Sequence, residues 1–249
     1  ELELVSGAPA DLFAMAQQWL QAHGLWLDTV SKAERGALLQ AGRLHAPPLR
    51  ARAAPVDGSM GGATLMRRWV AAVLAHALPN ASALAAGSAE PEHLHQWRVA
   101  MRRLRTLLRE LEPWARGLDE CVLPAVDDAF HALGRVRDHV SLLAAVRPLL
   151  VEAKAPLIDL PEPDDLPKPS VVVRAAALQS ACVALLDFAM SDPPPPGATT
   201  GPDEARALIA QRLESLYDRT RRDARRYATL SADDQHRVRL RLKRLRDLA

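Results

Sequence analysis

Arginines recur at helical spacing in residues 95–109 (HQWRVAMRRLRTLLR), a segment without an acidic residue. At about 100° per residue, its basic side chains fall on one side of a helix, and Trp97, Met101 and Leu104 fall on the other. Guanidinium groups at this spacing lie roughly 5–6 Å apart and donate paired hydrogen bonds to phosphate oxygens. The pattern therefore predicts an amphipathic helix that binds a polyanion. The residues of this helix that we expect to bind the polyanion are His95, Arg98, Arg102, Arg105 and Arg109.

The same spacing recurs in residues 236–248 (HRVRLRLKRLRDL), at a constant offset of 141 residues. A helix face that is only solvated needs charged residues, but it does not need them at the same relative positions in two segments. The repeat therefore favours anion binding over simple solvation. Two such helices facing each other would form a basic channel. The candidates in the second copy are His236, Arg239, Lys243 and Arg246, and Arg103 with Arg244 form a weaker repeated pair.

A third basic stripe lies in the helix expected over residues 204–229. Its candidate ligands are Arg212, Arg219, Arg222 and Arg226. Three acidic residues, Glu214, Asp218 and Asp223, lie in the same segment, so a solvated and internally balanced face is the alternative here. Two weaker candidates lie elsewhere. Arg67 belongs to a single arginine pair, and Arg137 precedes Asp138, which also suits an ion pair.

The remaining patterns do not indicate catalysis. His95 and His236 have no Cys, Asp or Glu at ligand spacing, so we expect no metal site and no cofactor, and a purely structural role for both is the alternative to phosphate binding. The helical part contains no nucleophile motif, glycine-rich phosphate loop or paired carboxylates. We therefore expect a protein that is not an enzyme. Aromatic residues are not interleaved with the basic ones, which argues against nucleic acid as a partner.

The composition supports a helical protein with segregated charge. The 249 residues include 32 Lys and Arg against 30 Asp and Glu, so anion binding must depend on local clusters. Aromatic residues make up 4% of a chain rich in Ala, Leu and Arg, which favours helix over sheet. Two isolated cysteines suit a reducing compartment. Without a signal peptide or a long apolar run, we expect a cytoplasmic protein with no membrane segment.

The expected fold is all-α, with a short α+β remnant at the N-terminus. The alternating pattern of residues 1–5 (ELELV) predicts a strand, residues 8–23 a helix and residues 25–27 a second short strand. Residues 46–62 are rich in proline and glycine and predict a linker. Proline-rich segments at 156–169 and 192–202 separate the later elements, and Gly134 suggests a break in one helix. Helices are expected over 65–78, 90–112, 118–151, 170–190, 204–229 and 232–249.

The doubled motif H-x-x-R-x-x-x-[RK]-R-L-R, followed after its first copy by Arg137-Asp138-His139-Val140, resembles the CHAD domain, the conserved histidine α-helical domain. The resemblance covers residues 63–249, with one repeat over 63–191 and a second, incomplete repeat over 203–249. It implies a bundle of two four-helix units around a basic pore that binds inorganic polyphosphate. It also implies a bacterial protein associated with polyphosphate granules. Nothing in the sequence indicates an oligomeric state or a preferred chain length.

Residues 1–45 resemble the end of a CYTH domain, the triphosphate tunnel fold. The resemblance implies that residues 1–4 form a tunnel strand with metal-facing acids, and that Lys32 and Arg35 are tunnel cations. The chain begins with Glu1 and ends within a helical pattern, so we expect a fragment of a longer protein. About 45 residues cannot form an eight-stranded tunnel, so we expect no triphosphatase activity from this chain. The alternative is that a full-length CYTH domain hydrolyses triphosphate or polyphosphate bound by the helical domain.

Overall fold

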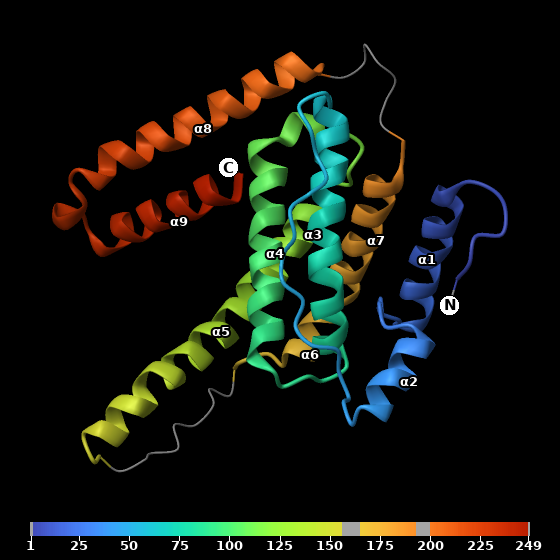
Figure 1. Ribbon diagram of the computed structural model, residues 1–249, viewed down its shortest axis with the longest axis horizontal. Helices are drawn as coiled ribbons and strands as arrows, with labels where there is room; N and C mark the ends of the chain where they lie inside the picture. Colours follow the sequence, from blue (N-terminus) through green and yellow to red (C-terminus); the bar gives the residue numbers. More distant parts are fainter. Residues whose placement is uncertain (1, 156–164, 193–199, 249) are drawn as a thin grey trace.

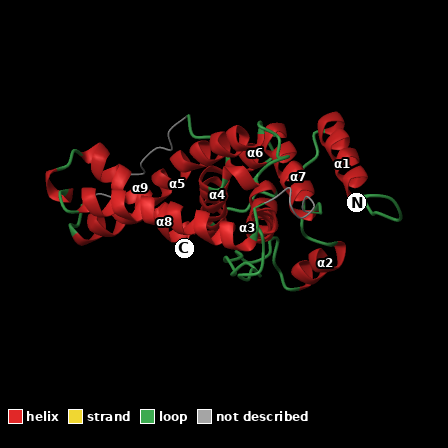
Figure 2. Ribbon diagram, turned by 90° about the horizontal axis from the view of Figure 1, so that it is seen from above, coloured by secondary structure: helices red, strands yellow, loops and turns green. Residues whose placement is uncertain are grey.

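The computed structural model describes residues 2–155, 165–192 and 200–248, and this described part contains helices and no strand (Figures 1 and 2). The all-α prediction is confirmed. The helices are α1 (Pro9–His23), α2 (Lys32–Gln40), α3 (Gly62–Ala85), α4 (Pro91–Glu110), α5 (Val122–Glu152), α6 (Pro169–Val173), α7 (Ala176–Met190), α8 (Pro202–Ala224) and α9 (Ala232–Leu248). Most of the proline-rich segments expected around 156–169 and 192–202 lies outside the described residues.

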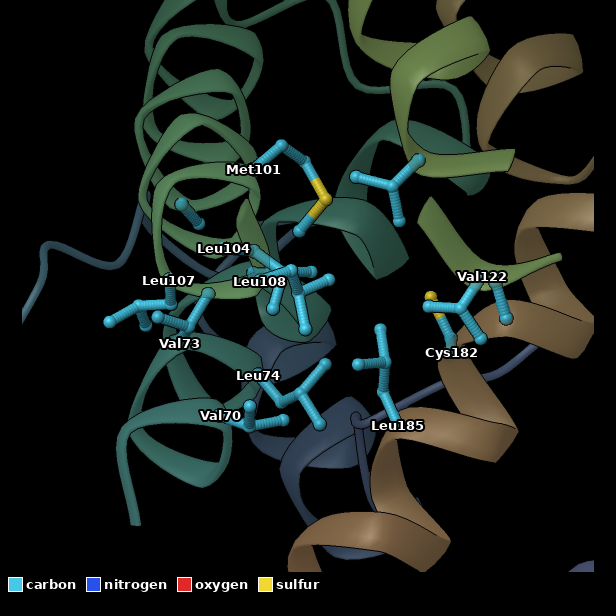
Figure 3. Packing of buried hydrophobic residues seen from close by; sticks show 14 of the residues in the cluster. Val70, Val73, Leu74, Met101, Leu104, Leu107, Leu108, Val122, Cys182 and Leu185 are labelled. Atoms are coloured by element: carbon cyan, nitrogen blue, oxygen red, sulfur yellow. The ribbon is translucent and has the colours of Figure 1, made fainter. Parts of the chain in front are cut away.

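Helices α3, α4, α5 and α7 form the central bundle, and Figure 3 shows their aliphatic side chains meeting in one core. The apolar seam predicted for the first arginine segment is buried as expected. Trp97 and Met101 are each 2% exposed and Leu104 is fully buried. Each large aliphatic side chain buried in this way stabilises the fold by about 1.5–3 kcal/mol. Because this seam faces the core, the arginine side of α4 is directed toward α5 and α9.

Two expectations about helix continuity were wrong. α5 runs unbroken through Gly134, because this residue is needed for space rather than for a bend. A Cβ at Gly134 would lie 3.0 Å from Nη1 of Arg98, so glycine lets that guanidinium lie against α5. The helix expected over 170–190 is divided into α6 and α7. The side-chain amide of Gln179 donates a buried hydrogen bond of 2.6 Å to the free carbonyl of Val173 at this division.

The strand predictions at the N-terminus were also wrong for the described residues. Residues 2–5 form an irregular loop in which Val5 is 92% exposed, because no neighbouring strand is present to pair with them. The second short run is also irregular, and the backbone N–H of Leu27 donates instead to Oε1 of Gln179 at 2.8 Å. α1 packs Phe13 and Leu20 against Val183 of α7. The N-terminal segment is thus packed onto the helical bundle.

The segment expected as a linker lies along α3 and α4 (Figure 1), and buried polar side chains attach it there. Asn80 of α3 bonds both backbone groups of Leu49, at 3.2 and 3.0 Å. His93 donates from Nε2 to the carbonyl of Ala46 at 3.0 Å. Beside them, His76 bonds Oε1 of Gln96 at 2.9 Å. Burial is the main cause that lowers the pKa of both His76 and His93.

Helices α8 and α9 form a hairpin that projects from one side of the bundle (Figure 1). Ser231 caps the start of α9, since its Oγ accepts from the N–H of Asp234 at 3.1 Å. Gln235 closes the turn by donating to the carbonyls of Tyr227 and Leu230. Ala205 at the start of α8 and Leu248 at the end of α9 join the main core. The hairpin is therefore attached to the bundle at the end opposite its turn.

Candidate anion-binding site

A cleft of about 550 Å³ lies between α8 and α9. Six of its eight lining side chains are arginines, one is acidic and one is leucine. The lining residues are Arg219, Arg222, Asp223, Arg226, Arg237, Leu240, Arg241 and Arg244. The cleft therefore carries a large excess of positive charge on side chains that keep their charge at any physiological pH.

Each helix contributes one face to this cleft. Arg219 and Arg222 lie on α8, and Arg226 lies in the turn directly after its end, at the spacing of three and four residues that the sequence predicted. On α9, the lining positions 237, 240, 241 and 244 also follow helical spacing. This face of α9 borders the cleft because the helix buries Val238, which is 1% exposed, on another side. The burial of Val238 therefore decides which arginines of α9 are brought together with those of α8.

Ion pairs compensate part of the charge of the cleft, and Arg237 has its partner in Asp234 of α9, at 2.6 Å. Asp223 lies 2.6 Å from Arg241 and 3.7 Å from Arg226. Arg244 lies 4.0 Å from Glu110 of α4, at the inner end of the hairpin. Within the described part of the chain, neither Arg219 nor Arg222 has a carboxylate partner, and Arg219 instead bonds the carbonyl and hydroxyl of Ser215. These two guanidinium groups are the donors most readily offered to an anion.

The predicted stripe of α9 does not line the cleft. His236, Arg239, Lys243 and Arg246 are exposed on a different side of the helix. Arg239 donates to the hydroxyl of Tyr227 at 2.9 Å, and Arg246 lies 3.3 Å from Asp247. Arg212 is likewise exposed on α8, outside the cleft lining. The structure therefore separates the second motif from the third stripe, although both lie on the same hairpin.

Two cleft residues, Arg237 and Arg241, were missed by the sequence reasoning. At the offset of 141 they correspond to Gln96 and Ala100 of α4, which are buried in the bundle. They do not belong to the repeated motif, because the first copy has other residue types at these two positions. A search for residues that are identical in both copies therefore does not find them. The signal that could have found them is the spacing of Arg237, Arg241 and Arg244 along one helix face.

The first arginine stripe packs within the protein, against α5 and α9. Arg98 donates to the carbonyl of Phe130 at 2.6 Å, and the guanidinium groups of Arg98 and Arg105 lie 4.3 and 4.2 Å from the centre of the Phe130 ring. Arg105 and Arg109 both pair with Asp127. Burial lowers the pKa of Arg98 and of Arg105, although arginine stays protonated near neutral pH.

Arg102 of this stripe reaches across to α9. Its Nε lies 2.8 Å from Oδ2 of Asp247, whose side chain is only 3% exposed. His95 is half-buried at the start of the same stripe. The structure thus brings Arg98, Arg105 and Arg109 together around α5 and joins Arg102 to the end of α9. Whether these residues bind a phosphate chain stays a prediction.

The weaker candidates are distributed over the molecule, and Arg244 is the one that lines the cleft. Arg67 lies on α3, 4.5 Å above the Phe188 ring, and donates to the carbonyls of Ser191 and Ala63. Arg103 and Arg137 are half-buried on α4 and α5. Over the described ranges, no group of three His, Cys, Asp or Glu residues could hold a metal ion. No helix in those ranges is both long enough and apolar enough to span a bilayer.

Comparison with known families identifies most of the helical part of the chain. The family model of the CHAD domain matches residues 68–249, which include both copies of the motif and the whole cleft. No curated protein matches the chain. No solved structure matches it either. The match does not include residues 1–67, so the resemblance of residues 1–45 to a CYTH domain stays a prediction.

Proposed function

The chain belongs to the CHAD domain family, and we propose that it binds inorganic polyphosphate in the basic cleft between α8 and α9. The observation that carries the proposal is the composition of the cleft, with six arginines and a single acidic side chain among its eight lining residues. Polyphosphate is the ligand that the resemblance to this family implies. In the cell, such binding would bring the protein to polyphosphate granules.

The chemistry of the cleft suits a linear chain of phosphates. A guanidinium group donates several hydrogen bonds in a fixed plane and matches the geometry of phosphate oxygens. Arginines on two facing helices can contact successive phosphates from both sides. Neutralising these phosphates releases bound counterions, so the affinity should fall steeply as the salt concentration rises. Binding of this kind needs no nucleophile, metal or proton transfer, and we propose a binding protein rather than an enzyme.

The arginines of α4 have a supporting part in this proposal. Arg244 connects the cleft to α4, since it lies 4.0 Å from Glu110. A phosphate chain longer than the cleft would extend from Arg244 toward Arg105 and Arg109, where Asp127 is the competing anion. In this proposal the cleft is the primary site, and the first motif extends it for long phosphate chains.

A titration with long-chain polyphosphate tests the proposal. The variant Arg219→Glu with Arg222→Glu reverses the two cleft arginines that have no carboxylate partner within the described residues. We expect its affinity to fall about 100-fold or more, because hydrogen bonds to charged groups contribute about 1.5–3 kcal/mol each. Calorimetric titration at a fixed salt concentration measures the change.

The matched control is Arg50→Glu with Arg52→Glu. These two exposed arginines lie on the segment before α3 and not in the cleft, and their replacement changes the net charge by the same amount. We expect it to bind nearly as well as the unmodified chain. Equal losses in both variants would mean that net charge, rather than the cleft, governs binding. Equal affinity for duplex DNA and polyphosphate would reduce the proposal to general polyanion binding.

A further inference from the structure

Asp223 places a negative charge inside the cleft, between arginines of both helices. Its Oδ2 accepts a hydrogen bond of 2.6 Å from Arg241 of α9, and its Oδ1 lies 3.7 Å from Arg226 in the turn after α8. The carboxylate and Arg241 are both partly exposed, at 26% and 22%. Asp223 is the one acidic residue among the eight that line the cleft. It therefore holds donors that an incoming phosphate would otherwise use.

The position of Asp223 is not explained by a need to hold the hairpin together. Ala205, Leu216, Val238 and Leu248 of the hairpin are all nearly fully buried, and an ion pair open to solvent adds little to such packing. Within the cleft, in contrast, the carboxylate has a direct effect. A bound phosphate near Arg241 must either displace it or lie beside a like charge, and both are unfavourable.

We propose that Asp223 is a specificity-determining residue, which disfavours short phosphate compounds in the cleft relative to long polyphosphate chains. The inference rests on the proposed function of the cleft. It adds that the carboxylate of Asp223 determines which phosphate compounds the cleft prefers.

The selection follows from the number of contacts that each ligand can make. A short anion such as tripolyphosphate reaches only a few arginines, so the loss of Arg241 and Arg226 to Asp223 removes a large share of its contacts. A long chain can instead lie along Arg219 and Arg222 and continue beyond the cleft toward Arg212. Its many weak contacts add together, so one competing carboxylate matters proportionally less.

The test compares tripolyphosphate with long-chain polyphosphate on the full chain and on Asp223→Asn. Asparagine keeps an oxygen that accepts from Arg241, so the variant removes the charge while preserving the contact. At about 0.15 M salt, where charges are screened over about 8 Å, we expect tripolyphosphate to bind roughly three- to tenfold more tightly to the variant. Long-chain polyphosphate should gain clearly less, so the ratio of the two affinities should shrink.

Asp203→Asn is the matched control. It is the same substitution on the same helix, and Asp203 also pairs with an arginine, Arg206. The site lies twenty residues before Asp223, which corresponds to about 30 Å along a helix. We expect its two affinities to equal those of the unmodified chain. Asp223→Glu keeps the charge and should keep the selection.

The outcomes separate the two proposals. If the unmodified chain does not bind long-chain polyphosphate, the proposed function fails and this inference fails with it. If the chain binds but Asp223→Asn leaves the ratio of affinities unchanged, only the inference is overturned. Weaker binding of both ligands to Asp223→Asn also overturns it, because the carboxylate would then be needed to position Arg241. Thermal unfolding of each variant confirms that the hairpin is intact.

Discussion

Helices α4 and α9 carry the same basic motif at the same spacing, yet the two copies have different surroundings. In α4, the arginines are half-buried and paired with Asp127, Asp247 and the ring of Phe130. In α9, the corresponding residues are mostly exposed, and the cleft forms on a neighbouring face. The cleft positions Arg237 and Arg241 replace Gln96 and Ala100, which belong to the bundle interior in the first copy.

A repeated motif does not by itself produce a repeated cleft in this structure. In the first copy, the face equivalent to the cleft is occupied by packing against the bundle. In the second copy, the same face is released from the core and carries arginine. The departures from the repeat therefore mark the cleft more clearly than the positions that are kept.

The largest expected effect is on stability and distinguishes the two regions directly. Arg102→Ala leaves the buried Asp247 with Arg246 as its remaining cation partner among the described residues, so we expect it to lower the free energy of unfolding by about 3 kcal/mol. Arg241→Ala breaks the partly exposed pair with Asp223 and should cost about 1 kcal/mol or less. Urea unfolding of both variants gives the two values. Similar losses of unfolding free energy in the two variants would mean that the ion pairs of α4 stabilise the fold no more than those of the hairpin.

A smaller effect is expected at Phe130. Its ring lies beneath both Arg98 and Arg105, and Phe130→Leu removes these two contacts while the backbone carbonyl that binds Arg98 stays. Each contact of this kind contributes about 0.5–1 kcal/mol, so we expect a loss of about 1–2 kcal/mol. Binding of polyphosphate by the cleft should not change. If Phe130→Leu weakened binding without changing stability, the α4 arginines would belong to the binding site itself.

The smallest expected effect concerns pH and again separates bundle from hairpin. His76 and His93 are buried, and burial is the main cause that lowers their pKa values. The charge of Arg103 also lowers the pKa of His76, and His45 lowers that of His93. Glu90 and Glu92 act in the opposite direction on His93. Below the ordinary histidine pKa of about 6.5, the unfolded chain takes up protons that the folded chain resists. Stability should therefore be fully present above that value and be lost as the pH falls through the lowered pKa values.

Urea unfolding at several pH values from about 7 to 5 measures this loss. The control is His76→Gln with His93→Gln, in which most of the dependence should disappear. The arginines of the cleft do not titrate in this range. An unchanged pH dependence in the double variant would assign it to other groups.

The sequence was sufficient to locate most of the long helices but not to determine how these helices are rotated relative to one another. Apolar periodicity identified α4 and its buried seam, because Trp97, Met101 and Leu104 must face a core. The acids that neutralise the α4 stripe could not be assigned in this way, since Asp127 and Asp247 lie 22 and 145 residues from their partners Arg105 and Arg102. The face of α9 that borders α8 likewise depends on the burial of Val238, which is a property of the assembled hairpin.

The alternation in residues 2–5 was a weaker signal than the helical periods. A strand needs a partner to satisfy its backbone, and a pattern of a few residues does not indicate whether one exists.

The bond between Arg102 and Asp247 has a practical consequence for how the domain can be shortened. A boundary placed after Arg246 would keep every arginine of both motifs and of the cleft. It would nevertheless remove Asp247 and Leu248, which attach the C-terminal end of α9 to the bundle. Such a truncated protein would keep its full set of basic side chains on a hairpin that is hinged at one end only.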